Sequence, residues 1–176
     1  MATMVTREKR MNFDLVAIDL DGTLLGSDNK ISPRVEETLT QVQAIGIKVT
    51  IATGRMFMSA RTFAKQLGID VPLICYQGAQ IRDPITGKIV TEALIPQEIA
   101  LSVINYCKKN SYHVNAFQGD MVYMDALTEE GKFYLGLSGV DGTVVNDLTH
   151  WLTEDLLKLV IITDESTTIK IVKELT

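Results

Sequence analysis

Cysteine and histidine are scarce in this 176-residue chain, which contains two of each. Cys75 and Cys107 lie far apart in the sequence, and His113 and His150 are equally isolated. These absences exclude a disulfide framework and a zinc site, and they indicate a reducing, cytoplasmic location. We expect both histidines to have structural roles. We also expect Cys75, which lies in a predicted buried strand, to be an unreactive apolar residue.

The chain also has fewer positively than negatively charged residues, and it has no long apolar run. The 17 Lys and Arg residues are outnumbered by 22 Asp and Glu residues, which gives a formal net charge of −5. Nucleic acid is therefore excluded as a partner, and any anionic substrate would need a local cation. No stretch approaches the roughly 18 apolar residues of a membrane helix. Asp14 and Asp19 interrupt the first apolar segment, so we expect no signal peptide and no contact with a membrane.

The composition is that of a globular protein, with 46% hydrophobic and 22% charged residues, and it predicts one domain with at most a modest insertion. After a polar tail over residues 1–12, apolar runs and helical stripes alternate. Strands are predicted over 15–18, 47–52 and 72–76, and helices over 33–46 and 57–67. This order predicts an α/β fold built on a right-handed, doubly wound parallel sheet. The run over 15–18 is typical of a strand buried on both faces.

The alternation ends after the third strand. Turn residues predict two hairpins, over 80–92 and 114–124. Helices are predicted from Pro96, over 126–137 and from Ser166, with a weak strand at 144–145 and a firm strand over 157–163. The second half is therefore α+β, and the chain divides into the tail at 1–12, a doubly wound part at 13–84 and an α+β part at 85–176.

The sequence Asp19-Leu20-Asp21-Gly22-Thr23 stands at the end of the first predicted strand. Ligands bind beyond the carboxyl ends of strands in open α/β sheets, so two acidic residues there are placed to share a metal or a phosphate. One alternative is that both aspartates cap loop amides in a turn. A calcium loop does not fit, because Leu24 stands where glycine is required and Lys30 where the bidentate glutamate belongs.

This motif resembles the first motif of the haloacid dehalogenase superfamily. The sequence Thr50-Ile51-Ala52-Thr53-Gly54-Arg55 resembles the second motif in the Cof-type branch, subfamily IIB. Tyr76-Gln77-Gly78-Ala79 is similar to the stretch after the third strand, where that branch usually has Asn in place of Gln77. The resemblance covers the chain after residue 12 and implies part of the core followed by an incomplete, inserted α+β cap.

The resemblance also implies a Mg²⁺-dependent phosphatase for small phosphorylated metabolites such as sugar phosphates. Asp19 would attack phosphorus to form an aspartyl-phosphate. Asp21 would protonate the leaving alcohol and then deprotonate water, which requires a raised pKa. Mg²⁺ would bind the Asp19 carboxylate and the Asp21 backbone carbonyl.

Three groups would bind the phosphoryl oxygens, namely the amides of Leu20 and Gly54 and the hydroxyl of Thr53. Arg55 either orients the substrate or is simply solvated. Gly22 and Gly26 bracket a segment similar to the small hairpin flap of the superfamily. Four apolar residues form the core of the cap or face the substrate, namely Phe117, Met121, Tyr123 and Met124.

Two further motifs of the superfamily are absent, a lysine after the cap and a Gly-Asp acidic motif. The late lysines, Lys158, Lys170 and Lys173, fall in predicted cap elements. Members of the superfamily add further strands on the other side of the first strand, and without them the first strand becomes an apolar sheet edge. The chain is therefore either a fragment or is covered at that edge by another chain, for which self-association is one possibility. We therefore expect weak or no turnover. The alternatives are a phosphomutase or phosphotransferase, and a non-catalytic phosphate-binding or dimerising module.

Overall fold

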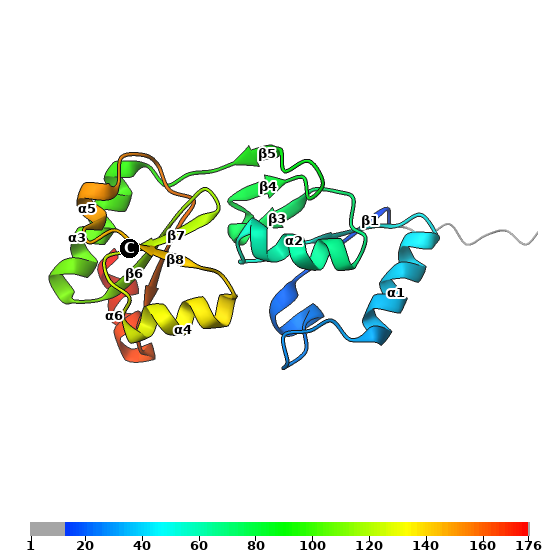
Figure 1. Ribbon diagram of the computed structural model, residues 1–176, viewed down its shortest axis with the longest axis horizontal. Helices are drawn as coiled ribbons and strands as arrows, with labels where there is room; N and C mark the ends of the chain where they lie inside the picture. Colours follow the sequence, from blue (N-terminus) through cyan, green and yellow to red (C-terminus); the bar gives the residue numbers. More distant parts are fainter. Residues whose placement is uncertain (1–12, 176) are drawn as a thin grey trace, which may run out of the picture.

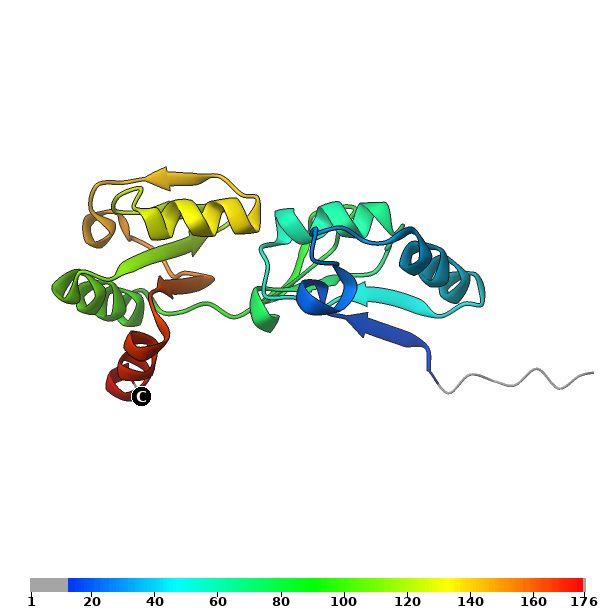
Figure 2. The same cartoon turned by 90° about the horizontal axis from the view of Figure 1, so that it is seen from below.

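The computed structural model describes residues 13–175, so the expected N-terminal tail lies outside the described residues. Figures 1 and 2 show two groups of elements side by side along the long axis, which we call the core lobe and the cap lobe. The core lobe contains β1 (Leu15–Ile18), α1 (Pro33–Ala44), β2 (Lys48–Ile51), α2 (Phe57–Gln66), β3 (Leu73–Cys75), β4 (Gln80–Arg82) and β5 (Ile89–Glu92). The cap lobe contains α3 (Gln97–Asn110), β6 (His113–Gln118), β7 (Met121–Met124), α4 (Glu129–Ser138), β8 (Gly142–Val144), α5 (Leu148–Trp151), β9 (Lys158–Ile162) and α6 (Glu165–Leu175).

The core lobe has the predicted parallel pairing. β1 pairs with β2 in parallel, and a parallel bridge between Ala52 and Ile74 continues this arrangement to β3. β4 and β5 form the predicted hairpin and add antiparallel strands to β3, so this sheet extends to Glu92, beyond residue 84. The α/β fold class is thus confirmed.

β1 is more exposed than its apolar sequence suggested. Leu15 and Ala17 are exposed and Ile18 is half-buried. The prediction of a strand buried on both faces is wrong because, within residues 13–175, β1 pairs with β2 alone and forms the edge of the sheet. The separate prediction that this strand forms an edge of the sheet is correct within the described residues.

The segment after β1 also differs from the expected flap. Leu20–Leu24 forms an irregular π-helical turn, in which the carbonyls of Asp19 and Leu20 accept hydrogen bonds from the amides of Leu24 and Leu25. Gly22 has a φ of 74°, a backbone angle that glycine adopts without strain. The hydrogen bond from the Gly26 amide to the Lys30 carbonyl closes a turn, and the described part of the flap contains no strand.

The cap lobe is a four-stranded sheet in the order β8-β7-β6-β9. α4 begins at Glu129, later than predicted, because the Thr128 hydroxyl accepts a hydrogen bond from the Gly131 amide and caps the helix there. The weak strand lies at Gly142–Val144, earlier than predicted. The short helix α5 is not among the predicted elements, and Asp147 caps it by accepting a hydrogen bond from the Thr149 amide.

One apolar cluster connects the two lobes. Phe117 and Met124 of the cap sheet are fully buried against core-lobe residues that include Leu20 and Phe57, so both belong to the core. Tyr123 instead stacks on Trp151, and Met121 is exposed. The Tyr76 hydroxyl donates a hydrogen bond to the Gly119 carbonyl, and Arg82 forms an ion pair with Asp120, so polar contacts also cross this junction.

The cysteines and His113 have the expected structural character. Cys75 and Cys107 are free and buried, and burial raises their pKa values to about 12 and about 11. The His113 ring lies within hydrogen-bond distance of Thr128 and Asn115. Within residues 13–175, none of the helices has the length and apolarity to cross a bilayer.

Candidate active site

The predicted site residues follow the carboxyl ends of neighbouring parallel strands. Asp19 and Asp21 follow β1, Thr53 to Arg55 follow β2, and Tyr76 to Gly78 follow β3. The register that aligns Ile18 with Ile51 brings the first two loops to the same edge. The two sequence motifs therefore meet in space.

Asp19 caps the turn that follows its own strand. Its Oδ1 accepts a hydrogen bond of 2.8 Å from the Leu20 amide, and its carboxylate is exposed. The Leu20 amide, predicted to bind phosphate, thus donates to Asp19 in this conformation. The hydrogen bond holds the carboxylate in a defined orientation at the carboxyl end of β1.

Arg55 forms an ion pair with Asp21 across the two loops. The Arg55 Nη2 lies 2.6 Å from Asp21 Oδ1, and Nε lies 2.9 Å from Oδ2. This bidentate contact lowers the pKa of Asp21, chiefly through the hydrogen bonds from the guanidinium. The prediction of a raised pKa is therefore wrong for this conformation, because it was based on the needs of an acid catalyst and did not anticipate a cation at the carboxylate.

The Arg55 side chain is not solvated, so one of the two predicted alternatives is excluded. Only 13% of it is exposed, and its guanidinium lies over the Phe63 ring at 5.4 Å from the centroid. The pairing with Asp21 raises the pKa of Arg55, so the guanidinium stays charged.

The loop after β2 is tightly packed. Thr53 is buried, and its hydroxyl accepts a hydrogen bond of 3.2 Å from the Arg55 amide. Gly54 lies against the side-chain amide of Gln77, and a Cβ at this position would overlap that amide. Gln77 itself has a left-handed backbone with a φ of 52°. The residue that replaces the family's usual asparagine therefore contacts the second motif directly.

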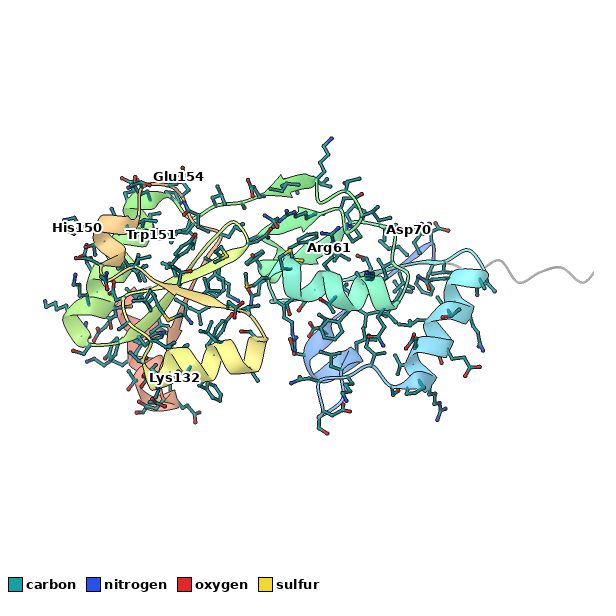
Figure 3. All side chains as sticks on the ribbon, in the orientation of Figure 1. Arg61, Asp70, Lys132, His150, Trp151 and Glu154 are labelled. Carbon is teal, nitrogen blue, oxygen red and sulfur yellow. The ribbon has the colours of Figure 1, made fainter. Side chains whose placement is uncertain are left out.

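A cavity of about 370 Å³ lies beside these loops and is shared by the two lobes. The core lobe contributes six residues, namely Asp21, Gly54, Arg55, Met56, Ser59 and Gln77. The cap lobe contributes Tyr134, Leu137, Ser138 and Lys158. Figure 3 shows side chains of both lobes in the region between them.

Sequence reasoning placed Lys158 in a cap element but did not connect it with the site. In the structure, Lys158 Nζ donates a hydrogen bond of 3.1 Å to the Gly54 carbonyl. The available signal was a lysine inside an otherwise apolar strand, Leu157 to Ile162. That pattern predicts a polar partner for the lysine, but it does not indicate which loop contains the partner.

The oxygen donors of the site suit Mg²⁺, in a coordination shell that leaves positions for water and substrate phosphate. No cluster of three or more His, Cys, Asp or Glu side chains that could hold a metal occurs within residues 13–175. Mg²⁺ prefers oxygen ligands and usually keeps several waters, with one or two carboxylates and substrate phosphate completing its shell. Asp19 offers an exposed carboxylate, whereas the Asp21 carboxylate is occupied by Arg55 and leaves its backbone carbonyl as the available donor.

Comparison with known proteins decides the family. A family profile described as haloacid dehalogenase-like hydrolase matches residues 16–176. The chain belongs to this family. Among curated relatives of this haloacid dehalogenase-like chain, phosphatase YwpJ of Bacillus subtilis is 35% identical over 109 residues, which cover 62% of this chain and 38% of YwpJ. The chain thus spans well under half the length of that relative.

Solved structures share the fold of this haloacid dehalogenase-like chain. A haloacid dehalogenase-like hydrolase from Bacteroides thetaiotaomicron has a TM-score of 0.83 at 24% identity, with 93% of this chain and 63% of that chain covered. The subclass IIB sugar phosphatase BT4131 has a TM-score of 0.75 at 18% identity, with 92% and 63% covered. Both likenesses concern the fold, and both structures extend beyond the part that this chain matches.

Proposed function

We propose that this chain carries the nucleophile and part of the cap of a Mg²⁺-dependent phosphatase for small phosphorylated metabolites. The observation that carries the proposal is the meeting of the two motifs, in which Asp19 and the Asp21–Arg55 pair share one edge of the parallel sheet. The names of two matched proteins, phosphatase YwpJ and the sugar phosphatase BT4131, support hydrolysis of a phosphate ester as the reaction.

Asp19 is the proposed nucleophile. A carboxylate oxygen of Asp19 would form a bond to phosphorus while the bond between phosphorus and the ester oxygen breaks, leaving an aspartyl-phosphate and an alcohol. Water would then attack the same phosphorus and release inorganic phosphate and the free carboxylate. When bound, Mg²⁺ would reduce the repulsion between the carboxylate and the phosphate dianion.

Asp21 is the proposed acid and base. Its proton would go to the ester oxygen in the first step, and it would take a proton from water in the second. Because Arg55 holds Asp21 ionised in this conformation, the acid role requires Arg55 to leave the carboxylate. A phosphoryl group offers Arg55 an alternative bidentate anion.

The dimensions of the cavity support a small substrate. A volume of about 370 Å³ is at the lower end of the range of about 300–1,000 Å³ that small-molecule sites occupy. The free cysteines favour the reducing cytoplasm as the location.

The experiment is to add beryllium fluoride and Mg²⁺ to the 176-residue chain and to record the ¹⁹F NMR spectrum. We expect an adduct that mimics the aspartyl-phosphate in the wild-type chain and no adduct in the Asp19→Asn variant. Hydrolysis of an aryl phosphate by both proteins is measured in parallel, and we expect it to be weak and to require Asp19. An absent adduct in the wild-type chain, or measurable hydrolysis that is equal in both proteins, would refute the proposal.

A further inference from the structure

Lys158 is the one lysine within residues 13–175 that is partly buried, whereas the others are exposed. Lys48, Lys108, Lys132 and Lys170 each lie within 4.0 Å of a carboxylate, and each has more than half of its side chain exposed. Lys158 is less exposed, and within residues 13–175 it has no carboxylate partner. Its hydrogen bond goes to a neutral backbone carbonyl, that of Gly54.

The strand register directs this side chain to the site. Lys158 is paired with Phe117 across β6 and β9, and its ammonium lies 5.6 Å from the centre of the Phe117 ring. Side chains alternate between the two faces of a strand. Leu159 packs into the cluster beneath α3, whereas Val160, on the same face as Lys158, packs against the cluster shared with the core lobe. The lysine therefore lies on the face of the cap sheet that meets the core lobe.

Two cations line the cavity, and Lys158 is the one without an anionic partner within residues 13–175. The other cation that lines it, Arg55, is neutralised by Asp21. Burial lowers the pKa of Lys158, because the ammonium gives up water without gaining a counter-ion. A net charge of −5 disfavours anions in general, so an anionic ligand needs such a local positive charge.

We propose that Lys158 is a substrate-binding residue of the cap, whose ammonium leaves the Gly54 carbonyl to bind the phosphoryl group of a phosphate monoester. The inference rests on the proposed function for the identity of that anion. Gly54 belongs to the loop expected to bind phosphate, so an ammonium 3.1 Å from its carbonyl is already within reach of a group bound there. Tyr134 and Leu137 of α4 would line the space for the organic part of the substrate.

The first test measures the affinity of the 176-residue chain for inorganic phosphate in the presence of Mg²⁺ by isothermal titration calorimetry. We expect Lys158→Met to weaken binding about ten- to a hundredfold, as loss of a hydrogen bond between charged groups does. Lys158→Arg, which keeps the charge, should retain most of the affinity. Lys132→Met is the matched control, because Lys132 lies on α4 of the same lobe, outside the cavity, and pairs with Glu129 (Figure 3). Equal phosphate affinity in wild type and Lys158→Met, or no binding by the wild-type chain, overturns the inference.

The second test uses the wild-type chain alone, so it does not depend on the folding of a variant. Lysines are reductively methylated with and without phosphate, and the extent of modification is read by mass spectrometry. We expect phosphate to protect Lys158 and to leave Lys132 unchanged, an effect that a purely structural lysine would not show. Unprotected Lys158 overturns the inference.

Failure of the inference and failure of the proposed function give different results. Phosphate that protects Lys158 in a chain that forms no beryllium fluoride adduct supports the inference and refutes the phosphatase mechanism. An adduct that depends on Asp19, in a chain whose Lys158 is unprotected, overturns the inference alone.

Discussion

The guanidinium of Arg55 holds the carboxylate of Asp21 in a bidentate ion pair, with 2.6 Å between Nη2 and Oδ1 and 2.9 Å between Nε and Oδ2. The pair joins the loop after β1 to the loop after β2, so it fixes the two motifs relative to one another. It also keeps the proposed acid ionised until another anion competes for the arginine. Assembly and release of this pair are therefore central to how the site would work.

The strength of the pair can be measured by a double-mutant cycle. We expect a coupling free energy of about 1 kcal/mol between Asp21→Asn and Arg55→Met in urea unfolding, because 13% of the arginine side chain is exposed against 55% of the aspartate side chain. The control is the cycle of Lys48→Met and Asp70→Asn, a pair whose side chains are both more than half exposed, for which we expect a smaller coupling. A coupling no larger than in the control pair would contradict the prediction.

The contact between Gly54 and Gln77 leads to a second prediction. A methyl group at Gly54 overlaps the Gln77 amide, so Gly54→Ala should lower the free energy of unfolding by about 1–3 kcal/mol. Shortening the partner in Gly54→Ala/Gln77→Ala should restore most of this loss. Gly136→Ala is the matched control, because a Cβ there meets no atom within 4 Å and an alanine in α4 should stabilise by up to about 1 kcal/mol. Thermal and urea unfolding measure all four proteins, and a double variant no more stable than Gly54→Ala would show that the overlap is not the cause.

The loops after β1 and β2 could be predicted to meet because parallel strands place their carboxyl ends at the same edge. That rule depends on strand order alone, so Asp19 and Thr53 could be assigned to one site from their positions. The pairing of Asp21 with Arg55 depends on side-chain conformations in two loops, which spacing does not determine. A pKa predicted from catalytic need alone was therefore wrong in direction.

Contacts that depend on the pairing of strands far apart in the sequence could not be predicted. Lys158 and Gly54 are 104 residues apart, and they meet only because β9 pairs with β6 and the cap sheet packs against the core lobe. For β1 the apolar run correctly predicted a strand, but burial depends on what covers the strand. Within residues 13–175 only β2 pairs with it.

The exposed edge of β1 leads to a third prediction, for which we take a second copy of this chain as the partner. Leu15 is 53% exposed on a strand with one unpaired side in the described chain, and such edges pair with other strands. We expect the mass measured by analytical ultracentrifugation to rise with concentration, and we expect Leu15→Lys to suppress this rise. Ile99→Lys on α3 is the control, because Ile99 is 52% exposed in the cap lobe, away from this edge. A monomeric wild-type chain at every concentration, or equal association by both variants, would contradict the prediction.

The environment of Lys158 predicts a stability that depends on pH. Because burial lowers its pKa in the folded state, the unfolded chain binds this proton more tightly, and the charged ammonium costs folding free energy. The cost is fully present below the lowered pKa and disappears as the pH rises to the ordinary lysine value of about 10.4. Among the charged neighbours of Lys158 in the cavity, the pKa of Asp21 is lowered and that of Arg55 is raised, so neither group titrates within this window.

Lys158→Met should therefore unfold at a higher temperature than wild type at pH 7, and this difference should shrink as the pH approaches about 10.4. Circular dichroism melts across this range measure the effect, with Lys132→Met as the control, since Lys132 is exposed and paired with Glu129. A difference that does not change with pH would show that the ammonium carries no burial cost. A stabilising substitution that also weakens phosphate binding would mean that the charge at Lys158 opposes folding and is useful only when the substrate is bound.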